Sequence, residues 1–225
     1  MDGCHLSFVR IFTKLYQERE RVYLPCMLPP LNGLPLPAAF YARPTLDVAR
    51  ELLGARLVRI LPDGEQISGF INEAEAYIGE TDLGCHAKAG RTARTQVMYG
   101  PPGRAYVYFT YGMHWMLNAV TEAEGFPAAV LIRSVALETG HRAARIRRGN
   151  VPEKNLTNGP GKLAAAFQIN ISQNNIDLTQ IDSGLWIEPG LVISDSTVTQ
   201  TPRVGLYSVP EPWKSIPWRF LVTQE

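Results

Sequence analysis

Apolar and polar residues in the first part of the chain follow the period of a helix and then that of strands. The segment PTLDVARELLG, residues 44–54, predicts a helix that ends at Gly54. The segments ARLVRIL (55–61) and QISGFINEAEAYI (66–78) alternate on either side of the turn PDG, which predicts a β-hairpin.

Two more alternating segments, 105–112 and 114–121, meet at a tight turn around Gly112 and predict a protruding hairpin. A loop rich in Gly, Thr, Pro and Arg precedes them, and loops of such length often carry function. The other expected elements are a strand at 129–137, helices at 138–149 and 158–169, the latter with Asn158 as N-cap, and closing strands at 184–189, 203–208 and 218–223.

The strands cluster in the middle of the chain, helices lie around them, and no regular βαβ alternation occurs. This order predicts an α+β fold built on a curved, mainly antiparallel sheet. We expect one folded domain at 38–225. Residues 1–37 end in the Pro-rich stretch LPPLNGLPLP and are expected to form a poorly ordered N-terminal extension, with Met27 as an alternative start.

Composition narrows the class of protein. The 225 residues are 45% hydrophobic, which suits a globular core, and no run approaches the ~20 apolar residues of a membrane span. Charged residues interrupt the first thirty positions, so we expect no signal peptide. Three unevenly spaced cysteines favour a reducing compartment over a disulfide scaffold. We therefore expect a soluble cytoplasmic protein.

The net charge of +1 is uninformative, but the distribution of charge is not. No acidic residue occurs between Leu83 and Thr121, a segment with four basic ones. A second basic run lies in GHRAARIRRGN. Such local stripes suit contact with a phosphate backbone, and a solvated charged surface is the alternative. The four basic residues of the first stripe are Lys88, Arg91, Arg94 and Arg104.

Strand alternation places Glu73, Glu75 and Tyr77 on one face. Two carboxylates so close repel unless water or a cation lies between them, and in a cleft one of them would have a shifted pKa and could act as a base. The alternative is a solvent-facing strand edge. Cys85 and His86 lack the spacing of a metal site, so we expect neither metal nor cofactor, and His86 alone could be an ordinary loop histidine.

The next strand carries aromatic side chains on both faces, with Tyr106 and Tyr108 on one and Phe109 and Tyr111 on the other. Core packing is the usual reason for such a strand. Tyr111 differs because it lies at the turn, where a large exposed ring is unfavourable unless it inserts into a partner. The stacked bases of nucleic acid offer such a place when one nucleotide is extruded.

Six segments together resemble the alkyladenine (3-methyladenine) DNA glycosylases, in the same order and at similar spacing over about 150 residues. The sequence departs from the family pattern at NEAEAY, where the family has ETEAY, but the second glutamate is retained. The matching segments are EAEAY (73–77), His86, YVYFTYGM (106–113), Asn118, LIR (131–133) and GPGKL (159–163).

The resemblance implies a monomeric DNA repair hydrolase that acts on double-stranded DNA containing damaged purines, in the cytoplasm and at the nucleoid in a bacterium. Glu75 would activate the attacking water, and Arg133 would hold that water or contact a phosphate. The remaining implied roles are a base pocket of Tyr77, His86, Tyr108 and Asn118, an intercalating pair of Tyr111 and Met113, and phosphate contacts from Lys88, Arg91, Arg94, Arg104 and Lys162.

Asn118 would act by excluding the exocyclic amino group of guanine. Two other functions stay open at this stage. Lys162 could serve as the amine of a glycosylase-lyase, and the protein could bind damaged bases without hydrolysing them.

Overall fold

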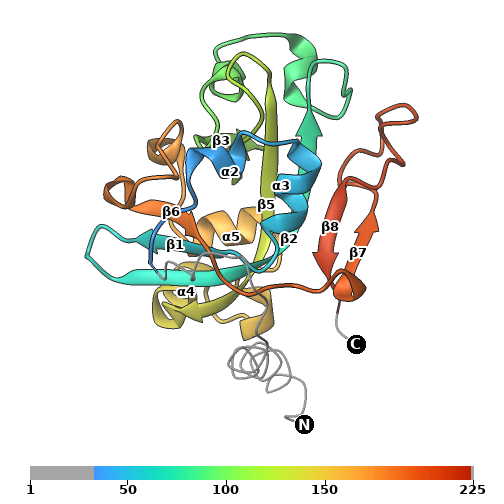
Figure 1. Ribbon diagram of the computed structural model, residues 1–225. Coiled ribbons are helices and arrows are strands. Elements are labelled where there is room, and N and C mark those ends of the chain that lie inside the picture. The colour runs from blue at the N-terminus through green and yellow to red at the C-terminus, as the bar shows by residue number, and fades with distance from the viewer. Residues whose placement is uncertain (1–32, 224–225) are drawn as a thin grey trace, which may run out of the picture.

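The computed structural model describes residues 33–223. Eight strands form one sheet in the order β3-β4-β5-β2-β1-β6, and the β7–β8 pair branches from β2 (Figure 1). All strand pairs in the described part of the chain are antiparallel. The strands are β1 (Arg56–Ile60), β2 (Gln66–Ile78), β3 (Ala105–Thr110), β4 (His114–Val120), β5 (Ala128–Thr139), β6 (Leu185–Glu188), β7 (Val198–Thr201) and β8 (Arg219–Val222).

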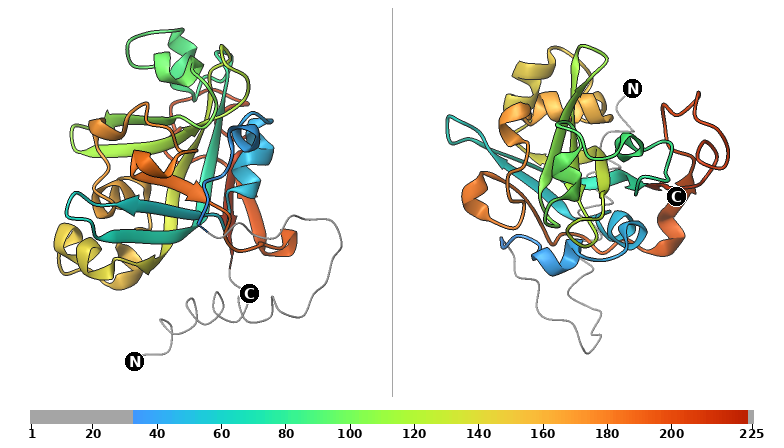
Figure 2. Two further views of the ribbon diagram at one scale, coloured as in Figure 1. Left: turned by 60° about the vertical axis from the view of Figure 1, so that its left-hand side comes forward. Right: turned by 90° about the horizontal axis from the view of Figure 1, so that it is seen from above.

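Helices cover this sheet, so the predicted α+β class is confirmed (Figures 1 and 2). α3 packs on β2 and β5, α5 packs on β4 and β5, and α4 packs on α5. The α-helices are α2 (Ala38–Tyr41), α3 (Thr45–Glu51), α4 (His141–Arg148) and α5 (Pro160–Ala166). The short 3-10 helices are η2 (His86–Ala89), η3 (Gln96–Tyr99), η4 (Glu153–Asn155), η5 (Ile171–Gln173), η6 (Ile181–Ser183) and η7 (Asp195–Thr197).

β2 is the strand on which the sheet divides. Its first half pairs with β1, and residues 73–75 pair on that edge with β8 instead, while β5 runs along the other edge. The register against β5 shifts between Ile71 and Glu73 and again between Glu73 and Ala74. Such irregularities bend a strand and increase its twist, which accounts for the curvature of the sheet.

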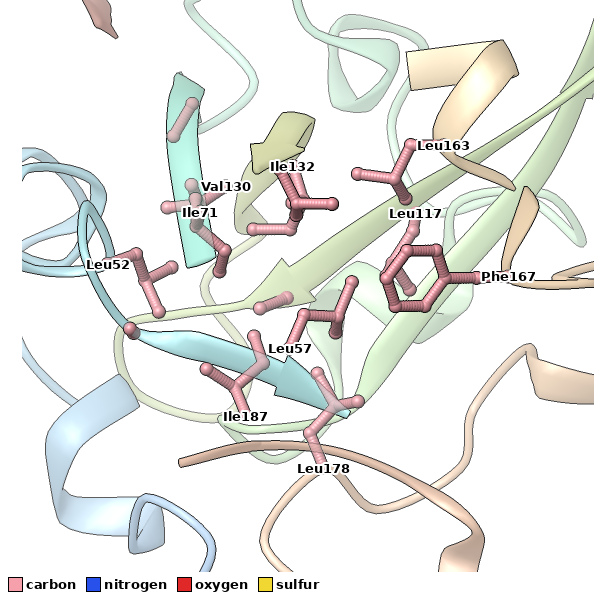
Figure 3. Packing of buried hydrophobic residues seen from close by; sticks show 14 of the residues in the cluster. Leu52, Leu57, Ile71, Leu117, Val130, Ile132, Leu163, Phe167, Leu178 and Ile187 are labelled. Carbon is pink, nitrogen blue, oxygen red and sulfur yellow. The ribbon is translucent and has the colours of Figure 1, made fainter. Parts of the chain in front are cut away.

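One main core lies between the sheet and the helices. Figure 3 shows Leu117, Leu163 and Phe167 close together, with Ile71 and Leu52 further along the same apolar layer. Leu36 also belongs to this core, and its N–H donates to the Ile187 carbonyl 2.7 Å away. The predicted extension at 1–37 lies mostly outside the described residues.

Two local expectations were wrong. Residues 203–208 form turns rather than a strand, because their polar groups bind other segments: the Arg203 guanidinium binds Asp82, and the Val204 N–H binds Glu75. β8 pairs instead with β7, which the sequence pattern did not predict. The N-cap of α5 is Gly159, not Asn158, whose side-chain Nδ2 donates to Asn155.

The helices in the described range 33–223 are all too short or too polar to span a lipid bilayer.

Truncation of Phe167 tests the core. This ring is 0% exposed, so we expect Phe167→Ala to lower the free energy of unfolding by about 3–5 kcal/mol through lost burial and a residual cavity. Urea unfolding followed by circular dichroism measures the change. Ile146→Ala, at a side chain on α4 that is 72% exposed, is the control and should change stability by less than about 0.5 kcal/mol. Equal losses in the two variants would contradict this assignment of the core.

Candidate active site

A cavity of about 270 Å³ opens between the β3–β4 hairpin and the turn that follows β7. β2, β5 and the segment around His86 form the rest of its wall. The lining side chains are mainly aromatic and apolar, with a few polar groups, which is the usual character of a small-molecule or base pocket. They include Tyr77, His86, Met98, Tyr106, Tyr108, Tyr111, Met116, Asn118, Leu131, Arg133, Val204 and Leu206.

Three aromatic rings form one side of the cavity. The Tyr106 and Tyr108 ring centroids are 5.3 Å apart, and both rings line the cavity, as strand alternation predicts. The His86 ring meets Tyr108 edge to face at 4.5 Å, and its Nδ1 lies 3.0 Å from the Tyr106 hydroxyl. Burial raises the pKa of Tyr106 to about 12, so its hydroxyl keeps its proton at neutral pH.

His86 is an uncharged member of this group. Burial lowers the pKa of its imidazole to about 4, and the nearby Arg94 and Lys88 charges add to that effect. Cys85, its neighbour, is buried, and burial raises the pKa of its thiol to about 12. The Cys85 side chain is therefore a poor nucleophile and packs as an apolar group.

Glu75 lies behind the cavity wall and is 0% exposed. Its Oε1 accepts from the Val204 N–H at 2.7 Å, and its Oε2 accepts from the Tyr77 hydroxyl at 2.8 Å. Arg133 Nη1 lies 3.3 Å from the same Oε2. Burial raises the pKa of Glu75, and the Arg133 charge and the hydrogen bonds from Val204 and Tyr77 oppose this rise by stabilising the carboxylate. Glu75 itself is not among the lining residues, but the three residues that bind it are.

Arg133 is the cation that separates the two glutamates of β2. Its Nε donates to Glu73 Oε1 at 2.7 Å, while its Nη1 faces Glu75. Arg219 on β8 donates to the same Glu73 oxygen at 2.7 Å. Burial alone would lower the pKa of Arg133, but Glu75 and Glu73 raise it above the usual value, so the guanidinium stays charged.

Asn118 and Tyr111 lie at the floor and the mouth of the cavity. Asn118 is buried on β4, and its Nδ2 donates to the Tyr106 carbonyl at 2.9 Å, which fixes the amide against the wall. Tyr111 is 75% exposed and has a φ of 52° at the hairpin turn, beside Gly112 with a φ of 67°. Tyr111 is thus largely exposed at the hairpin turn and also lines the cavity, and the neighbouring Met113 is exposed as well.

The predicted phosphate-binding residues are scattered, and each has a partner within the protein. Arg94 lies over the Tyr108 ring at 5.1 Å, and Arg91 lies over Tyr99 at 5.6 Å. The other three contacts are Lys88 Nζ to the Leu83 carbonyl at 2.8 Å, Arg104 to Asp177 at 3.6 Å and Lys162 Nζ to Asn158 at 2.9 Å. Arg104 precedes β3 and so lies at the opposite end of that strand from Tyr111. Contact between these residues and DNA stays a prediction.

The sequence analysis did not identify several residues that pack behind the cavity wall or bind its side chains. Arg203 forms a fully buried ion pair with Asp82, and its guanidinium lies 4.7 Å from the centre of the Tyr77 ring and 5.1 Å from that of Trp218. Arg203 also donates to the Ala76 carbonyl at 3.0 Å. Tyr106, Val204 and Arg219 were missed as well. Of these three, Tyr106 is the one that the sequence pattern could have identified as a cavity residue, because it shares a strand face with Tyr108.

Within residues 33–223, no three His, Cys, Asp or Glu side chains lie together in a way that could hold a metal ion.

The lowered pKa of His86 can be measured. We expect an NMR titration of its ring protons to give a pKa of about 4, and Arg94→Ala to raise it by removing a repelling charge. At pH values between the ordinary pKa of histidine and about 4, the unfolded chain binds a proton at His86 and the folded chain does not. The free energy of unfolding therefore falls as the pH drops through that window. Arg50→Ala, at an arginine on α3 that pairs with Asp195, is the control and should leave the His86 pKa unchanged. Titration of His86 near its ordinary pKa of about 6.5 would contradict this account.

Comparison with known proteins agrees with the resemblance described above. Residues 39–225 match the family model described as methylpurine-DNA glycosylase (MPG). A relative from Methanocella arvoryzae is 44% identical over 187 residues, which cover 82% of this chain and 90% of that protein. A relative from Myxococcus xanthus is 45% identical over 188 residues, which cover 83% of this chain and 89% of that protein. A relative from Streptomyces avermitilis is 42% identical over 193 residues, which cover 85% of this chain and 89% of that protein. All three carry the provisional name 3-methyladenine DNA glycosylase. The chain belongs to the methylpurine-DNA glycosylase family.

Proposed function

We propose that this DNA glycosylase releases alkylated purines, among them 3-methyladenine, from duplex DNA by hydrolysis after the damaged nucleotide has swung out of the helix. A water molecule activated by Glu75 attacks the anomeric carbon of the sugar. The observation that carries this proposal is a buried carboxylate held by two hydrogen-bond donors and one guanidinium, whose residues all line an aromatic cavity. The same pocket is proposed to accept deaminated purines, and the enzyme is proposed to act as a monomer.

The chemistry of the leaving group explains why such a site suffices. An N-alkylated adenine carries a positive charge, so its glycosidic bond is already weakened. Electron-rich rings such as Tyr77 and Tyr108 attract a cationic base. His86 adds no charge, because its lowered pKa keeps the imidazole neutral. Glu75 in turn stabilises the oxocarbenium-like transition state that glycoside cleavage passes through.

The hydrogen bonds of Glu75 leave one acceptor position of the carboxylate open. Each carboxylate oxygen has two lone pairs. Oε2 accepts from Tyr77 and faces Arg133, whereas the one hydrogen bond found for Oε1 within residues 33–223 comes from the Val204 N–H. A second lone pair on Oε1 can therefore accept a proton from water. General base catalysis of this kind contributes typically ~10²–10⁴-fold to the rate.

The other wall residues are proposed to select and replace the base. Asn118, fixed by its bond to the Tyr106 carbonyl, narrows the floor against the exocyclic amino group of guanine. Tyr111, supported by Met113, fills the space that the extruded nucleotide leaves in the duplex. Exposure of both hairpin side chains, and the place of Tyr111 in the cavity wall, support this role.

Replacement of the proposed base tests the mechanism. We expect Glu75→Gln to lower the single-turnover rate of base release from alkylated duplex DNA by at least ~10²-fold, because an amide cannot accept the proton. Binding to that DNA should stay within a few-fold, since the cavity wall is unchanged. Glu51→Gln, the same substitution at an exposed carboxylate on α3, is the control and should release base at the wild-type rate. Wild-type turnover by Glu75→Gln would rule out this role.

The lyase alternative is less well supported. Lys162 Nζ donates to Asn158 Oδ1, and the cavity wall contains Pro160 from α5 but not Lys162. A water nucleophile leaves no covalent protein–DNA intermediate. We therefore expect borohydride treatment during turnover to trap no adduct, as judged by gel mobility of labelled DNA. A trapped adduct that disappears in Lys162→Ala would establish the lyase instead.

A third possibility, binding of damaged bases without hydrolysis, is disfavoured because Glu75 is present and held by donors that line the cavity. The base-release assay above separates this possibility from hydrolysis.

A further inference from the structure

A second exposed aromatic ring, that of Tyr207, directly follows the cavity residue Leu206 along the chain. Tyr207 is 80% exposed, more than Tyr111. It lies in the turn Leu206–Val209, which is closed by a hydrogen bond from the Val209 N–H to the Leu206 carbonyl at 3.1 Å. In such a four-residue turn the second residue lies at the tip, so the Tyr207 side chain is presented to the surroundings.

The chain on the N-terminal side of this tip is anchored in the candidate active site. Arg203 is fixed by the buried ion pair with Asp82, and the Val204 N–H is bound by Glu75. Leu206 lines the cavity and packs so closely on Gly84 that a Cβ there would lie 2.7 Å from Leu206 Cδ1. The position of Tyr207 is therefore coupled to the same groups that form the pocket.

The segment that leads into this turn lies close to the hairpin that carries Tyr111. A Cβ built on Gly205 would be 3.7 Å from the Tyr111 hydroxyl, and both segments line the cavity. Seen from above, the β3–β4 hairpin and the β7–β8 connection project to the same side of the molecule (Figure 2, right). The cavity thus lies between the hairpin that carries Tyr111 and the segment that leads to Tyr207.

Single exposed apolar residues are common and usually need no explanation. Val192, for example, is 82% exposed in the segment between β6 and β7, but it is aliphatic and is not a cavity residue. Tyr207 differs in three respects: it is aromatic, it lies at the tip of a turn, and the chain beside it forms the pocket wall. Stacking or packing against a base is the interaction that such a ring offers to nucleic acid.

We propose that Tyr207 is a second aromatic contact to DNA, which packs against a nucleotide next to the extruded one while Tyr111 fills the gap in the duplex. This inference rests on the proposed extrusion of the damaged nucleotide. It adds a binding residue on the side of the pocket opposite the hairpin.

The test is affinity for a duplex that carries one tetrahydrofuran abasic-site analogue, measured by fluorescence anisotropy at fixed salt. We expect Tyr207→Ala to weaken binding about tenfold, since the stacking partner is removed. Tyr207→Phe keeps the ring and should bind like the wild type. Val192→Ala is the matched control, because it truncates an equally exposed side chain away from the cavity and should also bind like the wild type.

Wild-type affinity in Tyr207→Ala would overturn the proposal. Equal weakening in Tyr207→Phe and Tyr207→Ala would overturn it too, because the hydroxyl rather than the ring would then make the contact. Base release by the wild-type protein from alkylated duplex is measured in parallel. Failure of that reaction would reject the proposed hydrolysis, whereas the binding comparison does not require turnover and judges Tyr207 independently.

Discussion

The site depends on the complete burial of one carboxylate. A charged group removed from water is unfavourable unless hydrogen bonds and opposite charge replace the lost solvent. Glu75 obtains them from its own strand through Tyr77, from β5 through Arg133, and from the turn after β7 through Val204. Three segments far apart in sequence must therefore meet at one point, and the cavity is the space that their meeting leaves in front of the carboxylate.

The division of the sheet at β2 makes this convergence possible. Residues 73–75 pair with β8 on one edge and lie beside β5 on the other, so Arg219 and Arg133 approach Glu73 from the two neighbouring strands. The register of β2 against β5 shifts on either side of Glu73. Arg133 contacts both glutamates of β2, as their predicted common face requires, whereas Arg219 contacts Glu73.

Local patterns in the sequence predicted the parts of the site that lie within one strand. Alternation predicted the common face of Tyr106 and Tyr108, and the tight turn predicted the exposure of Tyr111. Long-range partners could not be predicted in this way, because the Val204 N–H and Glu75 are 129 positions apart. Val204 and Leu206 are apolar positions two residues apart, a pattern that favours a strand at 203–208. Both side chains line the cavity instead. The Val204 N–H binds Glu75, and the Leu206 carbonyl accepts the hydrogen bond that closes the turn.

The buried pair of Arg203 and Asp82 also limits how the enzyme can respond to its substrate. Both side chains are excluded from solvent, and the guanidinium is wedged between Tyr77 and Trp218. A loop anchored in this way cannot swing across a bound base without exposing a charge in the interior. If the nucleotide is extruded as proposed, the adaptation has to come from the nucleic acid, and the ease with which the DNA kinks at a weakened base pair then contributes to the recognition of damage.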